Sequence, residues 1–195
     1  IPVEILTAVP TLSGELASGL PEGSVVVAPD LGAVKLAERY AGILHGPVAV
    51  VRKQRESGAA VSALDIAGDV CGRSAVIIDD MITTGATIEA AAGLLRLRGV
   101  APDIVVAATH GLLVHAAVNR LRDLDLGRVL VTDTVAPKEA GTVIEVCSIA
   151  PTLAMAIACM HDDQPVEPIT GPPRAIGRRP TALLGTSGRL ASTIA

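Results

Sequence analysis

Six short runs of aliphatic residues, each apolar at consecutive positions, recur along this chain. They lie at Val25–Ala28, Val48–Val51, Ala75–Ile78, Ile104–Ala107, Val129–Val131 and Val143–Val146. A strand with one wet face alternates apolar and polar residues, whereas a strand buried on both faces is apolar throughout. Helical patterns separate most of the runs, at Gly32–Ala41, Thr87–Arg98, Val114–Arg122 and Thr152–His161. The alternation predicts an α/β fold with a doubly wound, mostly parallel sheet flanked by helices.

The residues available for a core agree with this prediction. Half of the 195 residues are apolar, yet there is no Trp, no Phe and a single Tyr, Tyr40. Val, Ile, Leu and Ala must therefore fill the core, as they do in parallel sheets. The scarcity of aromatic residues and the formal net charge of -4 argue against binding of nucleic acid. The most apolar stretch, 143–160, is too short and too polar to span a membrane.

We expect one domain over residues 1–161, followed by a tail. Residues 162–195 are rich in Pro, Gly and Ser and are predicted to be disordered. The chain begins at Ile1 rather than Met, which indicates a segment removed upstream. Cys71, Cys147 and Cys159 share no metal-binding spacing, so we expect small buried hydrophobic residues in a reducing, cytoplasmic compartment. The polar segment 52–65 is predicted to be a long functional loop.

Residues 76–87, with the sequence VIIDDMITTGAT, carry the clearest signal for function. A buried strand ends in Asp79 and Asp80 and continues through a turn rich in Thr and Gly into a helix. Such a turn presents backbone N–H groups to an anion, and the helix dipole adds partial positive charge. Gly85 lets the backbone approach that anion closely. The carboxylates suit sugar hydroxyls or a hydrated Mg²⁺; the alternative is an ordinary strand end with two solvated aspartates.

This segment resembles the phosphoribosyl-pyrophosphate (PRPP) binding motif of type I phosphoribosyltransferases and of ribose-phosphate pyrophosphokinases, the PRPP synthetases. Other segments are similar to the synthetases in particular: 25–32 (VVVAPDLG), 48–55 (VAVVRKQR), 108–112 (ATHGL) and 129–134 (VLVTDT). The resemblance covers about residues 1–161 and corresponds to the carboxyl-terminal half of that family's chain. It implies a fold like that of the type I phosphoribosyltransferases.

The resemblance also implies substrates and roles. PRPP synthetases transfer the diphosphoryl group of ATP to ribose 5-phosphate with Mg²⁺, so we expect these two partners, this cofactor and a homo-oligomer. Asp79 and Asp80 would hold the ribose hydroxyls, and Asp30 would lie near a bound metal. Lys53 and Arg55 would be catalytic, stabilising charge on the transferred phosphates. The 5-phosphate would be held by the loop residues Thr83, Thr84, Gly85, Ala86 and Thr87.

Two departures from the family limit what this chain is expected to do. Thr83 stands where family members often carry an Asp, and the half of the family's chain that supplies most ATP contacts has no counterpart here. We therefore expect this chain to bind ribose phosphate without turnover of its own. Two alternatives stay open: a phosphoribosyltransferase that consumes PRPP, and a non-catalytic partner that regulates a synthetase. His110 follows a predicted strand and is expected to be structural rather than a general base.

Overall fold

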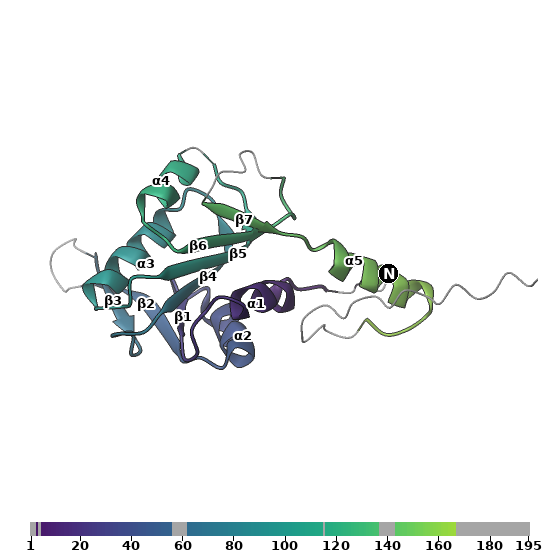
Figure 1. The fold of residues 1–195 in the computed structure, drawn as a ribbon, viewed down its shortest axis with the longest axis horizontal. Coiled ribbons are helices and arrows are strands. Elements are labelled where there is room, and N and C mark those ends of the chain that lie inside the picture. The colour runs from purple at the N-terminus through teal and green to yellow at the C-terminus, as the bar shows by residue number, and fades with distance from the viewer. Residues whose placement is uncertain (1–2, 4, 56–61, 115, 137–142, 167–195) are drawn as a thin grey trace, which may run out of the picture.

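A seven-stranded sheet forms the centre of the computed structural model, in the strand order β3-β2-β1-β4-β5-β6-β7 (Figure 1). The structure describes residues 3, 5–55, 62–114, 116–136 and 143–166, without the side chains of 53–55 and 62–64. The strands are β1 (Val25–Ala28), β2 (Val48–Arg55), β3 (Ser62–Ala67), β4 (Ala75–Ile82), β5 (Ile104–Gly111), β6 (Arg128–Thr132) and β7 (Ile144–Cys147). All neighbours pair in parallel except β2 and β3. The predicted doubly wound, mostly parallel sheet is confirmed.

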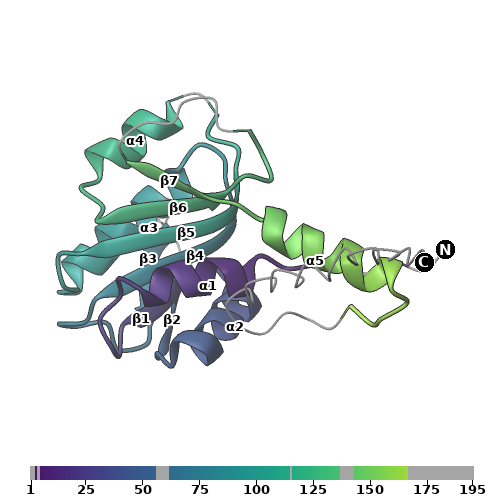
Figure 2. The ribbon, with the colours of Figure 1, turned by 45° about the vertical axis from the view of Figure 1, so that its right-hand side comes forward.

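Helices cover both faces of this sheet (Figure 2). Helices α1 (Val9–Ala17) and α2 (Val34–Leu44) pack on one face, and α3 (Ala86–Leu97) and α4 (Ala117–Asp123) on the other. In β1, Val25 and Val27 join the core under α3 and α4, whereas Val26 and Ala28 join the core under α1 and α2. Because successive strand residues face opposite sides, a strand between two helical layers must be apolar at every position.

Helix α5 (Ala150–His161) extends away from the sheet in both views (Figures 1 and 2). Its apolar side chains Leu153, Ile157 and Met160 are exposed. No helix in the described ranges is both long and apolar enough to cross a bilayer. Residues 162–166 continue beyond the helix, and most of the predicted tail, 167–195, lies outside the described residues.

The prediction of a long loop over residues 52–65 is wrong at both ends of the segment, and residues 56–61 lie outside the described residues. Strand β2 continues to Arg55 and pairs with the antiparallel edge strand β3, in register from Val50↔Ala67 to Arg55↔Ser62. Polar residues are tolerated at such an edge, so a search for apolar runs does not find it. The carboxylate of Asp65 accepts hydrogen bonds from Arg98 at the end of α3 (2.6 Å) and from Arg52 (3.4 Å), which connects the edge strand to the helical layer.

The sequence also led to two other errors. Helix α1 was not predicted: it is only nine residues long, and Ser13 and Gly14 interrupt its apolar spacing. The three cysteines are free thiols, but Cys71 is exposed and the other two are only half-buried, so the prediction of buried cysteines is wrong. Tyr40 is fully buried, and this burial raises the pKa of its hydroxyl.

Gly46, between α2 and β2, permits a close approach on which the β1–β2 pairing depends. A Cβ at this position would lie 2.2 Å from the carbonyl oxygen of Ser24, directly before β1. We expect Gly46→Ala to lower the free energy of unfolding by about 2–3 kcal/mol, because backbone must shift to make room. Gly42→Ala is the matched control, because a Cβ at this position meets nothing within 4 Å. This substitution should stabilise helix α2 by about 0.5–1 kcal/mol. Urea denaturation measures both, and a Gly46→Ala protein as stable as the original would contradict the close approach.

Candidate functional site

The strand order reverses between β1 and β4. The chain moves outward from β1 to β2 and β3, and then returns to place β4 on the other side of β1. In open α/β sheets ligands bind beyond the carboxyl ends of the strands at such a reversal. Asp30 follows β1, and Asp79 and Asp80 lie in the last part of β4. Three of the predicted site residues therefore flank the reversal.

A difference in strand length opens a notch at this point. Strand β1 pairs with β4 only as far as Val27↔Ile77, whereas β4 pairs with β5 as far as Ile82↔Gly111. The sequence predicted a buried strand that ends in Asp79 and Asp80, whereas β4 continues past both aspartates to Ile82. Pairing with the equally long β5 sustains it after the apolar run stops. The edge of β4 that faces β1 is thus left open beside Asp79 and Asp80.

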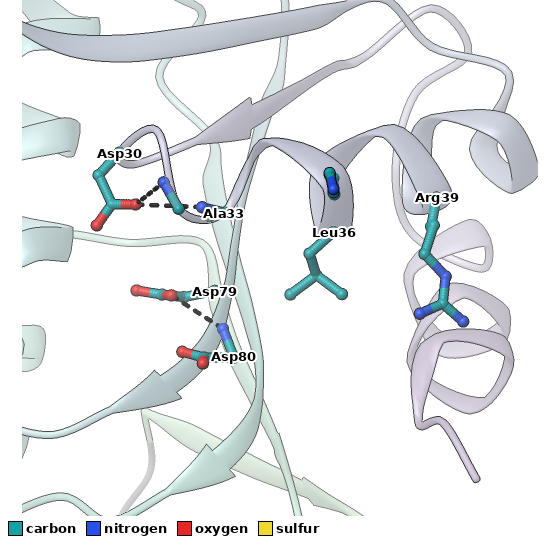
Figure 3. Close-up of a pocket in the computed structure, with 8 residues that line it drawn as sticks. Asp30, Ala33, Leu36, Arg39, Asp79 and Asp80 are labelled. Carbon is teal, nitrogen blue, oxygen red and sulfur yellow. Dashed lines mark hydrogen bonds between the residues drawn. The ribbon is translucent and has the colours of Figure 1, made fainter. Parts of the chain in front are cut away.

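A cleft of about 480 Å³ occupies this notch. In Figure 3 the carboxylates of Asp30, Asp79 and Asp80 lie at one end and Arg39 at the other. The lining residues are Asp30, Gly32, Ala33, Lys35, Leu36, Arg39, Asp79 and Asp80. The sequence analysis did not identify Lys35 and Arg39. Their signal is a spacing of four residues, one helical turn, on helix α2, which begins at Val34, shortly after Asp30.

The fold opposes ionisation of Asp79. Its Oδ1 atom accepts a hydrogen bond from the backbone N–H of Asp80 at 2.9 Å, and its side chain is half-buried. Burial raises the pKa of Asp79 to about 6, and the nearby charges of Asp80 and Asp30 add to the rise. The fold therefore concentrates negative charge here, which favours a ligand that brings hydroxyl groups or a cation.

Asp30 organises the turn that leads into α2. Its Oδ1 atom accepts hydrogen bonds from the backbone N–H groups of Gly32 (2.8 Å) and Ala33 (3.1 Å). Within the described part of the chain, no three His, Cys, Asp or Glu side chains come close enough to hold a metal by themselves. A cation at Asp30 would thus need further ligands from a substrate or from water, as is usual for Mg²⁺. The assignment of Asp30 to a metal stays a prediction.

The predicted phosphate loop connects β4 to α3. Gly85 is buried, has φ +75° and precedes the first residue of α3, Ala86. Gly85, the N-cap residue, has no side chain to cap the helix, and the N–H of Ala86 donates to the hydroxyl oxygen of Thr84 at 3.4 Å. The first N–H groups of any helix lack backbone partners within it. Thr83, Ala86 and Thr87 are exposed. The loop lies at the same edge of the sheet as the carboxylates but does not line the cleft itself.

Lys53 and Arg55 lie near the end of β2, beyond the last residue of β1. Their backbones pair with Leu64 and Ser62 of β3. Their side chains lie outside the described part, so their catalytic role stays a prediction.

His110, at the end of β5, lies beside β6. Its Nδ1 atom is 2.8 Å from the hydroxyl of Thr134, and that hydroxyl donates to the carbonyl of Thr109. These contacts fit the structural role expected of His110.

The family described as "Phosphoribosyl synthetase-associated domain" matches residues 59–167, more than half of the chain. The chain belongs to this family. It is 40% identical, over 167 residues, to a ribose-phosphate pyrophosphokinase of Streptomyces avermitilis, covering 83% of this chain and 51% of the relative. The resemblance to PRPP synthetases that the motifs indicated is thereby confirmed.

Solved structures agree. A phosphoribosylpyrophosphate synthetase from Mycobacterium smegmatis has a TM-score of 0.70 and 37% identity, covering 80% of this chain and 51% of that one. The adenine phosphoribosyltransferase of Giardia lamblia has a TM-score of 0.50 and 18% identity, covering 64% of this chain and 76% of that one, and shows the likeness in fold alone. The type I phosphoribosyltransferase-like fold is confirmed. The chain spans about half the length of the synthetases it matches.

The raised pKa of Asp79 predicts how stability responds to pH. A carboxyl whose pKa is higher in the folded state stabilises the fold while protonated, and this contribution is lost as the pH rises through about 6. Asp79→Asn has no proton to lose, so we expect its stability relative to the original protein to increase between about pH 4 and about pH 7.5. Urea midpoints at the two pH values measure the change. Asp103→Asn, which replaces an exposed aspartate before β5, gives the background, and the same difference at both pH values would contradict the prediction.

Proposed function

We propose that this chain is the ribose 5-phosphate-binding part of a ribose-phosphate pyrophosphokinase. That enzyme transfers the diphosphoryl group of ATP to the anomeric hydroxyl of ribose 5-phosphate, giving PRPP and AMP, with the hydroxyl proton passing to solvent. The observation that carries the proposal is the notch beside β4, where the carboxylates of Asp30, Asp79 and Asp80 lie together and from which β4 continues through Thr83–Gly85 into the start of α3. The names of the relatives support the same reaction.

Each part of the site contributes a different kind of contact. The helix start at Thr83–Thr87 offers N–H and hydroxyl donors, which bind the 5-phosphate. Asp79 and Asp80 offer acceptors, which bind the ribose hydroxyls once the pH exceeds the raised pKa of Asp79. Arg39, at the far end of the cleft in Figure 3, and Lys35, which also lines the cleft, bring positive charge that suits the phosphates of ATP.

Mg²⁺ fits this arrangement as a cofactor held partly by the substrate. The negative potential at one end of the cleft comes from Asp30, Asp79 and Asp80. These carboxylates do not enclose a metal by themselves, because Asp30 and Asp79 already accept hydrogen bonds from backbone N–H groups. Mg²⁺ commonly takes one or two carboxylates, and completes its coordination with phosphate oxygens and water. When bound, it would neutralise charge on the transferred phosphates.

The proposal includes a cytoplasmic place of action, which the three free thiols favour. It also includes a homo-oligomer, which sedimentation of the full-length protein tests.

The reaction itself is tested by supplying ATP with ribose 5-phosphate in one assay, and PRPP with a free nucleobase in another. Turnover only in the second assay would instead identify a phosphoribosyltransferase. Absence of turnover in both, with co-purification of an active synthetase, would identify a regulatory partner.

Asp80→Asn is expected to weaken binding of ribose 5-phosphate by about tenfold, because the amide replaces a charged acceptor of sugar hydroxyls. The side chain of Asp80 is exposed, so the fold should not change. Titration calorimetry measures the dissociation constant, with Asp103→Asn as the matched control at the opposite edge of the sheet. An unchanged dissociation constant would remove Asp80 from the ribose site.

Lys53→Ala is expected to lower kcat of the full-length enzyme by about 10²-fold or more, and to change KM for ribose 5-phosphate little. Charge that stabilises the transferring phosphates acts in the transition state rather than on the bound sugar. Steady-state kinetics with ATP and ribose 5-phosphate test this. A kcat equal to that of the original enzyme would exclude Lys53 from catalysis.

A further inference from the structure

The carbonyl oxygens at the start of the phosphate loop all point toward the segment that joins β5 to α4, and to α4 itself. The backbone N–H of Leu113 donates to the carbonyl of Ile82 (3.0 Å), and that of Val114 donates to the carbonyl of Thr83 (2.9 Å). The carbonyl of Thr84 accepts a hydrogen bond from the guanidinium Nη1 of Arg120. Two of the three anchors are therefore backbone groups, and the third is a side chain.

This anchoring determines where the N–H groups of the loop point. In a trans peptide the C=O of one residue and the N–H of the next point in opposite directions, and none of the described peptides is cis. Carbonyls directed toward α4 thus turn the N–H groups of Thr83, Thr84 and Gly85 to the opposite side. There they can converge on an anion, as consecutive N–H groups do in other phosphate-binding turns.

Arg120 has a second contact at the same helix start. Its Nε atom lies 2.9 Å from the carboxylate of Glu89, in the first turn of α3. A carboxylate at this position competes with a bound phosphate for the positive end of the helix. Because Arg120 pairs with Glu89, it both lowers that competition and holds the Thr84–Gly85 peptide.

We propose that Arg120 is a positioning residue for the 5-phosphate loop. It does not touch the substrate: it acts through the carbonyl of Thr84 and through Glu89, and keeps the N–H of Gly85 aimed at the phosphate. The packing agrees, since a Cβ on Gly85 would lie 3.6 Å from Cδ of Arg120 and 3.6 Å from Leu121. Helix α4 thus supports the loop from behind. This inference rests on the proposed function for the identity of the phosphate.

Arg120→Met in the full-length protein is expected to weaken binding of both ribose 5-phosphate and inorganic phosphate by about tenfold, as expected for loss of one well-oriented hydrogen bond to a charged group. KM for ribose 5-phosphate should rise, while kcat and KM for ATP stay the same. A purely structural defect would alter all three. Adding Glu89→Gln to Arg120→Met removes the unpaired carboxylate and should restore part of the lost affinity.

Arg122→Met is the matched control, because Arg122 lies on the same helix and bonds to Asn119 of that helix (3.0 Å). It should leave phosphate affinity unchanged. Equal affinities for Arg120→Met and the original protein, or equal losses for both variants, would overturn the inference. If Arg120→Met does not fold, Arg120→Lys takes its place with a loss of a few-fold expected, and unchanged affinity again overturns it. An original protein that binds inorganic phosphate but not ribose 5-phosphate refutes the proposed function alone.

Discussion

The site depends on one structural constraint: β4 is twice as long as β1 and is paired over its whole length by β5. Backbone pairing with β5 holds Asp79 and Asp80 in a rigid extended segment, while the early end of β1 leaves the other edge of that segment open. The cleft is therefore not a gap between mobile loops. One side of the cleft is lined by strand β4. The other is lined by the turn before α2, in which Asp30 accepts hydrogen bonds from the N–H groups of Gly32 and Ala33. A site built on regular elements keeps its functional groups in place without a ligand, which lowers the cost of binding.

The same strand separates two kinds of polar group. At Asp79 burial and neighbouring carboxylates oppose ionisation, so the fold loses stability to keep an acceptor there. Only a few residues later, the chain turns its carbonyl oxygens toward the β5–α4 segment and leaves N–H groups on the other side. A ligand with hydroxyls at one end and a phosphate at the other satisfies both requirements at once. Neither a free nucleobase nor a simple anion does so.

The fold could be predicted from the sequence, because buried parallel strands need apolar residues at every position and such runs are conspicuous. The exceptions among the strands have a common cause. Strand β3 and the ends of β2, β4 and β5 carry polar residues between the apolar ones and are held by backbone pairing, so a search for continuous apolar runs does not reveal them. The predicted carboxylates lie together at the cleft because the carboxyl ends of neighbouring parallel strands, and the residues directly after them, share one edge of the sheet.

Arg120 could not have been found in this way. It lies more than thirty residues from Thr84 along the chain, on a short helix, and its sequence neighbours give no sign of a ligand. The proposed role of Arg120 follows from the backbone hydrogen bonds of the loop. Each carbonyl that points away from the bound anion needs a hydrogen-bond donor on that side, and Arg120 is the donor for the carbonyl of Thr84. In phosphate loops generally, motif residues specify which N–H groups face the ligand, but the donors that hold the opposite carbonyls come from whatever element packs behind. Those supporting residues are therefore set by tertiary packing, and local patterns cannot locate them.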